Sequence, residues 1–274
     1  MSEPKSAPDL QPAPWLAGSS VLVTGAGGGI GSALCRKLLA HGANVVGLDI
    51  DTSWASRLDG GLPGRIHAVK GDVTVEREVT AAVEAAVSEY GRLDLVITAA
   101  GIQAVASIEE TQEDVWRKVL DINLTGTFLT CKHAVPALRA AGGGTILCIA
   151  STTALHPRVN LGAYCVSKAG VGMLVRVLGR EVAKDSIRVV GVCPTGVETP
   201  LLAGMIEGLR QGDTSKDQHG GLMASKPVQR WLSADEVAES ILWLSSPAAN
   251  AVTGSNIPID FASAYRRYLE DLST

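Results

Sequence analysis

Three side chains in the middle of the chain have the types and spacing for moving a proton. Ser151 follows the apolar run GTILCIA, and Tyr164 and Lys168 follow in AYCVSK. If this second segment is helical, Tyr164 and Lys168 lie one turn apart on the same face. A free tyrosine has a pKa of about 10, and a nearby ammonium group favours the phenolate. Tyr164 could then exchange a proton with an alcohol or carbonyl oxygen, which Ser151 could orient.

A glycine-rich turn near the start of the chain is suited to binding an anion. The segment TGAGGGIG at 24–31 follows an apolar, β-branched run and opens a helical segment. Such a turn directs bare N–H groups and the positive end of a helix toward a diphosphate. The glycines fit G-x-x-x-G-x-G through Gly25, Gly29 and Gly31, and Gly28 also allows G-x-x-G-x-x-G. The alternative interpretation is a tight turn that binds nothing.

Asp49 ends the second apolar run, eighteen residues after Gly31. An acidic residue at this place can accept both hydroxyls of an adenosine ribose. Its charge would repel the 2′-phosphate of NADP, and neither 26–28 nor Ile50 supplies a compensating cation. The sequence therefore favours NAD. Asp49 could instead serve only as a turn residue, since Asp51 follows it.

These residues need a scaffold in which strands alternate with helices. Strands are predicted from apolar, β-branched runs at 19–24, 44–49, 65–70, 93–98, 144–150, 187–193 and 256–259. Helices are predicted at 29–41, 75–90, 111–140, 162–184 and 233–246, with start signals at Thr74, Thr111 and Ser233. This alternation predicts a single-domain α/β fold, a Rossmann-like, doubly wound parallel sheet of about seven strands with helices on both faces. Ser151 would lie at the carboxyl end of a strand, where such sheets bind ligands.

Composition and charge argue against several classes of protein. The 274 residues carry 24 Lys+Arg and 28 Asp+Glu without a basic block, so nucleic acid is not an expected partner. The uncharged stretch 11–35 is interrupted by glycines and hydroxyl residues, so no membrane span is expected. The cysteines and histidines lack the spacing of metal ligands, so no metal is expected. Separated cysteines favour reduced thiols and a cytoplasmic location.

Three segments differ in composition from the predicted domain at 18–262. Residues 1–17 are rich in proline and are predicted to be a disordered leader, and 263–274 a C-terminal extension. Residues 200–227 are predicted to form a flexible flap, because 203–227 is Gly-rich and polar without clean periodicity. Its apolar residues, among them Leu201, Leu202 and Met205, would close over a small or medium secondary alcohol or ketone, such as an alicyclic one.

From about Gly18 to about Asp260, the chain resembles the compact, single-domain branch of the short-chain dehydrogenase/reductases. TGAGGGIG is similar to the cofactor loop of that family, and GDV at 71–73 is similar to its adenine-contacting segment. DINLTGTF contains the matching helix asparagine, and CPTGVETP resembles the loop over the nicotinamide. VTGSNIPID at 252–260 resembles the closing strand.

The resemblance implies an NAD-dependent oxidoreductase that interconverts a secondary alcohol and its ketone. Tyr164 would be the acid/base, Lys168 would lower the pKa of Tyr164 and bind the nicotinamide ribose, and Asn123 would organise a water relay. The implied catalytic residues are Asn123, Ser151, Tyr164 and Lys168. The implied NAD-binding residues are Gly25, Gly29, Ile30, Gly31, Asp49, Asp72, Val73, Ala100, Gly101, Tyr164, Lys168, Pro194, Val197 and Thr199. Helices 111–140 and 162–184 resemble the pair that joins subunits, which implies a homotetramer or homodimer.

The chain departs from the family pattern at three places. Thr98 stands where the family usually has asparagine, Thr195 stands where it has glycine after Pro194, and Phe261 begins a bulkier turn after Asp260. None of these departures removes a catalytic group. An NAD-binding sensor or scaffold on the same fold is the alternative function. An epimerase or dehydratase of the longer branch is not expected, since it needs a large C-terminal domain.

Overall fold

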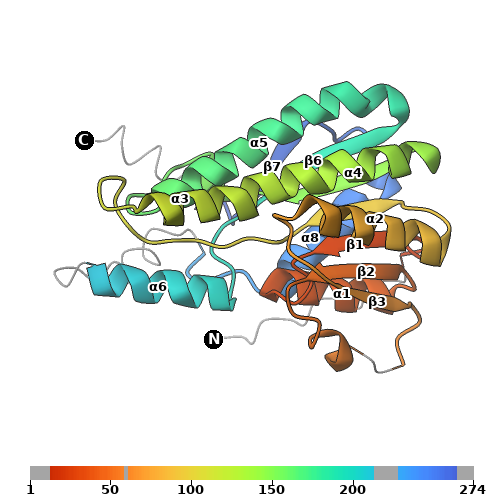
Figure 1. Ribbon diagram of the computed structural model, residues 1–274, viewed down its shortest axis with the longest axis horizontal. Coiled ribbons are helices and arrows are strands. Elements are labelled where there is room, and N and C mark those ends of the chain that lie inside the picture. Colours follow the sequence, from red (N-terminus) through yellow and green to blue (C-terminus); the bar gives the residue numbers. More distant parts are fainter. Residues whose placement is uncertain (1–12, 59–60, 213–227, 264–274) are drawn as a thin grey trace.

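One seven-stranded parallel sheet forms the centre of the molecule. The computed structural model describes residues 13–58, 61–212 and 228–263 (Figure 1). The strand order is β3-β2-β1-β4-β5-β6-β7, and every pairing is parallel, which confirms the predicted doubly wound sheet. The strands are β1 (Ser20–Thr24), β2 (Asn44–Asp49), β3 (Ile66–Lys70), β4 (Leu95–Thr98), β5 (Gly144–Ile149), β6 (Ile187–Pro194) and β7 (Ser255–Ile259).

Helices cover both faces of the sheet, because alternate strand residues are apolar on both sides. In β1, Val21 and Val23 pack in the core under one helical layer, and Leu22 packs in the core under the other. The first layer contains α1 (Gly29–Ala40) and α8 (Ala234–Ser245), and the second contains α2 (Glu76–Tyr90), α4 (Gly126–Ala140) and α5 (Gly162–Val182) (Figure 1). The predicted helices are confirmed, except for the middle of 111–140.

The predicted helix at 111–140 is interrupted. It consists of α3 (Glu113–Leu120), a π-helical segment (Asp121–Thr125) and α4. Wide turns of this kind occur often at functional sites. Here the π-helical segment contains Asn123, whose side chain is completely buried. The wide turn therefore contains one residue that the sequence assigned to the catalytic set.

Two of the three predicted helix start signals are wrong. The N-caps of α2 and α3 are Val75 and Gln112, and neither makes a side-chain capping bond. Thr74 donates its hydroxyl to Asp72 Oδ1 at 2.8 Å, and Thr111 donates its hydroxyl to a backbone carbonyl at 2.6 Å. These hydroxyls are thus used by local turns, which compete with capping.

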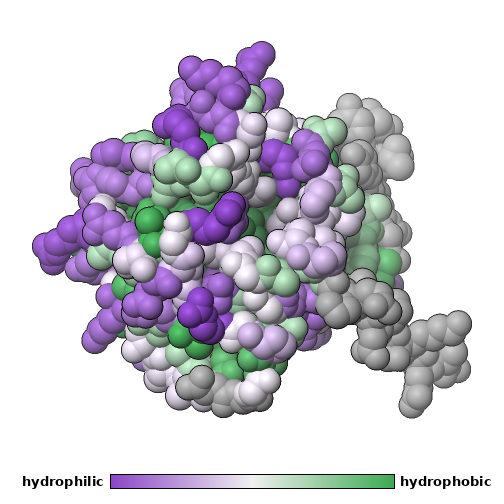
Figure 2. Space-filling view, turned by 90° about the vertical axis from the view of Figure 1, so that its right-hand side faces the viewer, coloured by the Kyte–Doolittle hydropathy of each residue, from purple (hydrophilic) through white to green (hydrophobic). Residues whose placement is uncertain are grey.

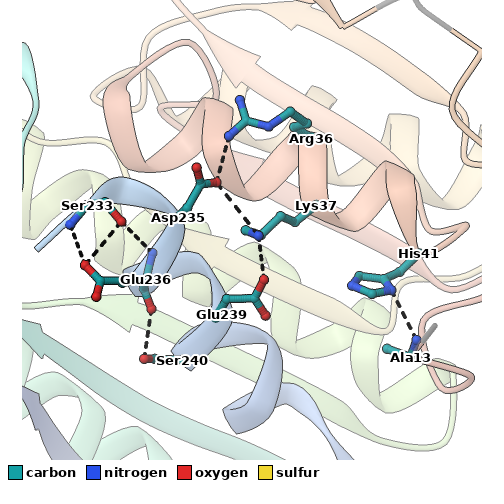
Figure 3. Close-up of polar contacts among 9 residues, drawn as sticks. All are labelled: Ala13, Arg36, Lys37, His41, Ser233, Asp235, Glu236, Glu239 and Ser240. Atoms are coloured by element: carbon teal, nitrogen blue, oxygen red, sulfur yellow. Dashed lines mark hydrogen bonds and ion pairs between the residues drawn. The ribbon is translucent and has the colours of Figure 1, made fainter. Parts of the chain in front are cut away.

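Ser233 does start a helix, as predicted. Its hydroxyl accepts from the N–H of Glu236, and the carboxylate of Glu236 accepts from the N–H of Ser233, which is a complete capping box (Figure 3). On the same helix, Asp235 pairs with Arg36 of α1 at 2.7 Å, and Glu239 pairs with Lys37 (Figure 3). These contacts fix α8 against α1, the helix that follows the glycine-rich turn.

The predicted limits of the leader and flap need correction. Ala13 and Leu16 are buried in the core, and the N–H of Ala13 donates to His41 at 3.1 Å, so 13–17 belongs to the folded domain (Figure 3). Helix α6 (Pro200–Gly212) includes the first part of the predicted flap, because its apolar residues pack against a small cluster. Residues 1–12, 213–227 and 264–274 lie outside the described part.

The loops that carry the candidate functional residues lie at one end of the sheet. The glycine-rich turn follows β1, and Ser151 follows β5. Because the strands are parallel, these turns meet at the carboxyl edge, beside the change of direction between β1 and β4. The opposite end carries hydrophilic side chains around smaller apolar areas (Figure 2). Within the described residues, no helix has the length and apolarity needed to cross a membrane.

Candidate active site

A pocket of about 830 Å³, counted with its open mouth, lies at the carboxyl end of the sheet. It brings together Ser151, Tyr164 and Lys168, which the sequence separates by up to seventeen residues. Other residues of the predicted site also line it: Ile30, Gly101, Pro194, Val197 and Thr199. The predicted catalytic hydroxyls and part of the predicted NAD-binding set therefore share one cavity.

Ser151 follows β5 and caps the short turn that comes after it. Its backbone is extended, and it caps a short 3-10 turn at 152–154 through a bond from the N–H of Thr153 to its Oγ at 3.2 Å. Its hydroxyl is near enough to Tyr164 to favour the phenolate of that residue. The two hydroxyls predicted to touch one substrate oxygen thus lie near each other in one pocket.

Lys168 is buried one helical turn after Tyr164. Only 4% of Lys168 is exposed, and its Nζ donates to the carbonyl of Ile149 at 2.7 Å. Burial disfavours the ammonium form and lowers the pKa of Lys168 to about 8. The Nζ lies 5.8 Å from the centre of the Tyr164 ring. Helical spacing thus brings the two residues together as predicted.

The electrostatics of Tyr164 differ from the expectation. Burial raises the pKa of Tyr164, and the hydrogen bond with Ser151 opposes that rise only in part. The effect of Lys168 on this pKa stays a prediction. Lys168 is itself desolvated, and its Nζ is bonded to Ile149. Tyr164 is held in its protonated form.

Asn123 braces the loop that follows β4. Its Oδ1 accepts from the N–H of Ile102 at 2.8 Å, and its Nδ2 donates to the carbonyl of Ile102 and to Ser167 Oγ, both at 2.9 Å. A Cβ placed on Gly101 would lie 3.3 Å from Asn123 Oδ1 and 3.5 Å from Lys168 Nζ. Asn123 and Lys168 therefore both approach Gly101, and the part of Asn123 in a water relay stays a prediction.

The glycine-rich turn has no room for a side chain at the three positions of the G-x-x-x-G-x-G spacing, and a Cβ on Gly27 would overlap Trp54 as well. Gly25 has a φ of +67°, and a Cβ there would overlap the backbone that follows β4. A Cβ on Gly31 would overlap the carbonyl of Gly25, and one on Gly29 would overlap the side chain of Thr199. Gly28 has an ordinary φ of −70°, and its Cβ would meet only a carbonyl at 3.2 Å. The geometry thus favours the G-x-x-x-G-x-G spacing.

The turn and the end of β2 have the donors and acceptors that a dinucleotide requires. Helix α1 begins after Gly28 without a side-chain cap and without an acidic residue in its first turn, so its first N–H groups suit a diphosphate. Asp49 Oδ2 accepts from the N–H of Gly27 at 2.8 Å, which holds the carboxylate beside the turn. A carboxylate has further lone pairs for ribose hydroxyls. The residues present therefore fit a dinucleotide.

The remaining predicted cofactor residues lie around this edge, outside the pocket lining. Asp72 follows β3, and its Oδ1 accepts two bonds from Thr74 at 2.8 Å each. The side chain of Val73 is buried against Gly126. Ala100 lies under Gly25, where the chain leaves β4. Their contacts with a cofactor stay predictions.

Several pocket residues were not found from the sequence. Arg158, Leu161 and Trp231 line the pocket together with residues of α6. Gln103 does line it, and its side chain donates to the carbonyl of Leu201 at 2.6 Å. Arg158 could have been suspected because it lies between Ser151 and Tyr164. In the ranges that the structure describes, no group of His, Cys, Asp or Glu side chains could hold a metal ion.

Comparisons with known proteins agree with this geometry. Residues 25–261 match the family described as enoyl-(acyl carrier protein) reductase. The chain is 37% identical to cis-4-hydroxycyclohexanecarboxylate dehydrogenase of Sinomonas cyclohexanicum, covering 87% of this chain and 94% of that protein. It is 35% identical to cyclohexanol dehydrogenase of Acinetobacter sp. strain SE19, covering 88% and 93%.

The solved structures include a short-chain type dehydrogenase/reductase from Mycobacterium ulcerans. Its TM-score is 0.84 at 30% identity, with 91% of each chain covered. The family match, the relatives and the shared fold extend over nearly the whole described chain. The chain belongs to the short-chain dehydrogenase/reductase family.

Proposed function

We propose that this protein is an NAD-dependent dehydrogenase that interconverts an alicyclic secondary alcohol and its ketone. The observation that carries the proposal is the pocket that Ser151, Tyr164 and buried Lys168 line together. The glycine-rich turn adjoins this pocket through Ile30 and Thr199. Alcohol oxidation needs a proton carrier at the hydroxyl oxygen and a hydride acceptor at the carbon that bears it, and this arrangement provides a place for both.

Each catalytic side chain has a role that follows from its contacts. Ser151 would donate to the substrate oxygen and orient it, and Tyr164 would exchange the proton with that oxygen. Because burial raises the pKa of Tyr164, its neutral form is ready to protonate a ketone. A bound nicotinamide coenzyme would supply the hydride acceptor or donor, and its positive charge when oxidised would favour the phenolate. Lys168 would bind the nicotinamide ribose.

Asp49 supports NAD as the coenzyme. Its carboxylate is held beside the glycine-rich turn by Gly27, where it can accept ribose hydroxyls and repels a 2′-phosphate. The next residue, Ile50, is 68% exposed and brings no positive charge. The charge at the end of β2 is therefore negative where NADP would require a cation.

The pocket lining and the relatives support the substrate class. Leu161, Leu202 and Met205 are buried and face one cavity, which suits an apolar ring. The two relatives above are named for 4-hydroxycyclohexanecarboxylate and for cyclohexanol, and both names describe a hydroxyl on a six-membered ring. The free, buried cysteines of the described chain suit a reducing compartment, so we also propose a cytoplasmic location.

The proposal is tested by following NADH absorbance with a panel of cyclic and acyclic secondary alcohols and their ketones. We expect turnover of cyclic members with NAD. Tyr164→Phe keeps the ring but removes the proton carrier, so kcat should fall by about 10²–10⁴-fold while NAD affinity is retained. Tight NAD binding without turnover of any member would favour the sensor function, and full activity of Tyr164→Phe would refute the proton-transfer role.

A further inference from the structure

Apolar side chains make up the part of the pocket wall that comes from α6 and the neighbouring loops. Leu161, Leu202 and Met205 belong to one buried cluster, and Val197 and Trp231 extend the same wall. An apolar wall excludes water and weakens the screening of any charge beside it. A charged side chain in this wall therefore has a strong influence on which substrates bind.

The charges that line the pocket are positive. The basic lining residues are Arg158 and Lys168, and within the described residues no Asp, Glu or His side chain lines the pocket. Lys168 is buried, and its Nζ donates to Ile149 O. Neither the proton transfer nor the binding of the coenzyme, as proposed above, involves Arg158.

The backbone of Arg158 is hydrogen-bonded to the residue that follows Tyr164. The N–H of Arg158 donates to Cys165 Sγ at 3.5 Å, and that thiol lies 3.8 Å from the carbonyl of Arg158. Cys165 is buried and directly follows Tyr164 in α5. On the other side of the loop, Asn160 has a left-handed φ of 61°, and its carbonyl accepts from Ala106 at 2.9 Å. The separation of Arg158 from Tyr164 is thus set by the fold.

A guanidinium group keeps its charge at every working pH and has several N–H donors in one plane. It can therefore bind a carboxylate through two parallel bonds alongside contacts within the protein. We propose that Arg158 binds a carboxylate carried by the substrate, so that the pocket takes a secondary alcohol that is also an organic acid. This inference rests on the proposed function, because the hydroxyl must meet Tyr164 while the carboxylate meets Arg158.

Turnover tests the inference with substrates that differ only in charge. We compare 4-hydroxycyclohexanecarboxylate with 4-hydroxycyclohexanecarboxamide, each as the cis and trans isomer, and include cyclohexanol. In the wild type, kcat/KM should be higher for the acid than for the amide. Arg158→Gln should lower the ratio of acid to amide by roughly 10- to 100-fold, mainly through KM, because a charge-assisted bond is lost. Arg158→Lys should restore part of the ratio.

Arg77→Gln is the matched control, since it removes the same charge from an exposed position on α2. It should leave the ratio of acid to amide unchanged. Equal use of acid and amide by the wild type, or an equal loss of both in Arg158→Gln, would overturn the inference. Turnover of cyclohexanol in that case would show that the proposed dehydrogenase function survives.

A binding measurement decides the inference even without turnover. Calorimetry compares cyclohexanecarboxylate with cyclohexanecarboxamide, with and without NADH. The carboxylate should bind the wild type more tightly, and Arg158→Gln should abolish this preference while its melting temperature stays close to that of the wild type. A preference that is absent in the wild type, or that persists in Arg158→Gln, contradicts the role of Arg158.

Discussion

Asp49 places a negative charge at the point where NAD and NADP differ. Its Oδ2 also accepts from the N–H of Gly27, so a truncation to alanine would loosen the turn as well as remove the charge. Asp49→Asn keeps an oxygen for that bond and is the cleaner test. The ratio of the NADP to the NAD dissociation constant should fall by at least about tenfold, because juxtaposed like charges cost several kcal/mol. Asp51→Asn, at an exposed neighbour, is the control.

The affinities of both coenzymes are measured by quenching of protein fluorescence or by calorimetry. Asp49→Asn should gain affinity for NADP and lose little affinity for NAD. A wild type that binds NADP as tightly as NAD would show that Asp49 does not select the coenzyme. An unchanged ratio in Asp49→Asn would lead to the same conclusion.

Lys168 makes stability depend on pH in a defined window. Burial lowers its pKa from the ordinary 10.5 to about 8, so the protonated form opposes folding. Below the folded pKa both states are protonated and the whole penalty acts. Between about 8 and 10.5 only the unfolded state keeps the proton, so the free energy of unfolding rises with pH. The raised pKa of Tyr164 acts in the opposite direction, but only above about pH 10, where an unfolded tyrosine ionises.

Urea unfolding of the wild type and Lys168→Met at about pH 7 and about pH 9.5 isolates this contribution. Relative to the variant, the wild type should gain roughly 2 kcal/mol of unfolding free energy over that interval. Lys184→Met, at the surface, should give the same pH profile as the wild type. A difference between wild type and Lys168→Met that stays constant with pH would contradict the penalty.

Residue types and spacing were enough to predict that Tyr164 and Lys168 lie together, because helical periodicity places them on one face. They were not enough to predict the electrostatics of Tyr164. Its pKa is raised mainly by burial, which arises from packing between distant segments. Arg158 and Trp231 were missed for the same reason, since a loop and a segment before α8 meet only in the folded pocket.

At the scale of elements, the first turn of α1 packs closely against the backbone of the glycine-rich turn that precedes it. A Cβ on Gly31 would overlap the carbonyl of Gly25, whereas Gly28 has an ordinary φ and more space. Gly31→Ala should therefore lower the free energy of unfolding by about 1–3 kcal/mol or more, and it should weaken NAD binding. Gly28→Ala changes only the N-cap of α1 and should cost about 1 kcal/mol or less. Equal costs in urea unfolding would contradict this assignment.

Strands were predicted to within two residues, because buried parallel strands are short apolar runs between turns. The outer limits of the helices were also predicted to within two residues, but two of the three capping residues were not. Thr74 and Thr111 have the type of a cap, but their hydroxyls are used elsewhere. Helix α6 was predicted as part of a flap, because its glycines interrupt the apolar pattern of a helix. In the structure, Leu202 and Met205 of this helix pack in the pocket wall. The π-helical segment around Asn123 has no sequence signal.

At the scale of the whole molecule, the fold leaves one apolar stripe uncovered. Val166, Met173 and Val177 of α5 recur at helical spacing and are 46%, 54% and 47% exposed. Phe128 of the neighbouring helix α4 is 45% exposed in the same layer (Figure 1). Exposed apolar residues that gather on one face are typical of a protein interface. These residues are consistent with the homotetramer or homodimer that the resemblance implies.

The oligomer prediction is tested by introducing a charge into this stripe. Met173→Arg would place an arginine in an apolar interface without a partner, and burying an unpaired charge is costly. Light scattering after size-exclusion chromatography should give a dimer or tetramer for the wild type and a smaller mass for Met173→Arg. Val87→Arg is the matched control, because Val87 is a 39% exposed apolar residue on α2, away from the stripe. A monomeric wild type, or an unchanged mass for Met173→Arg, would show that this stripe does not join subunits.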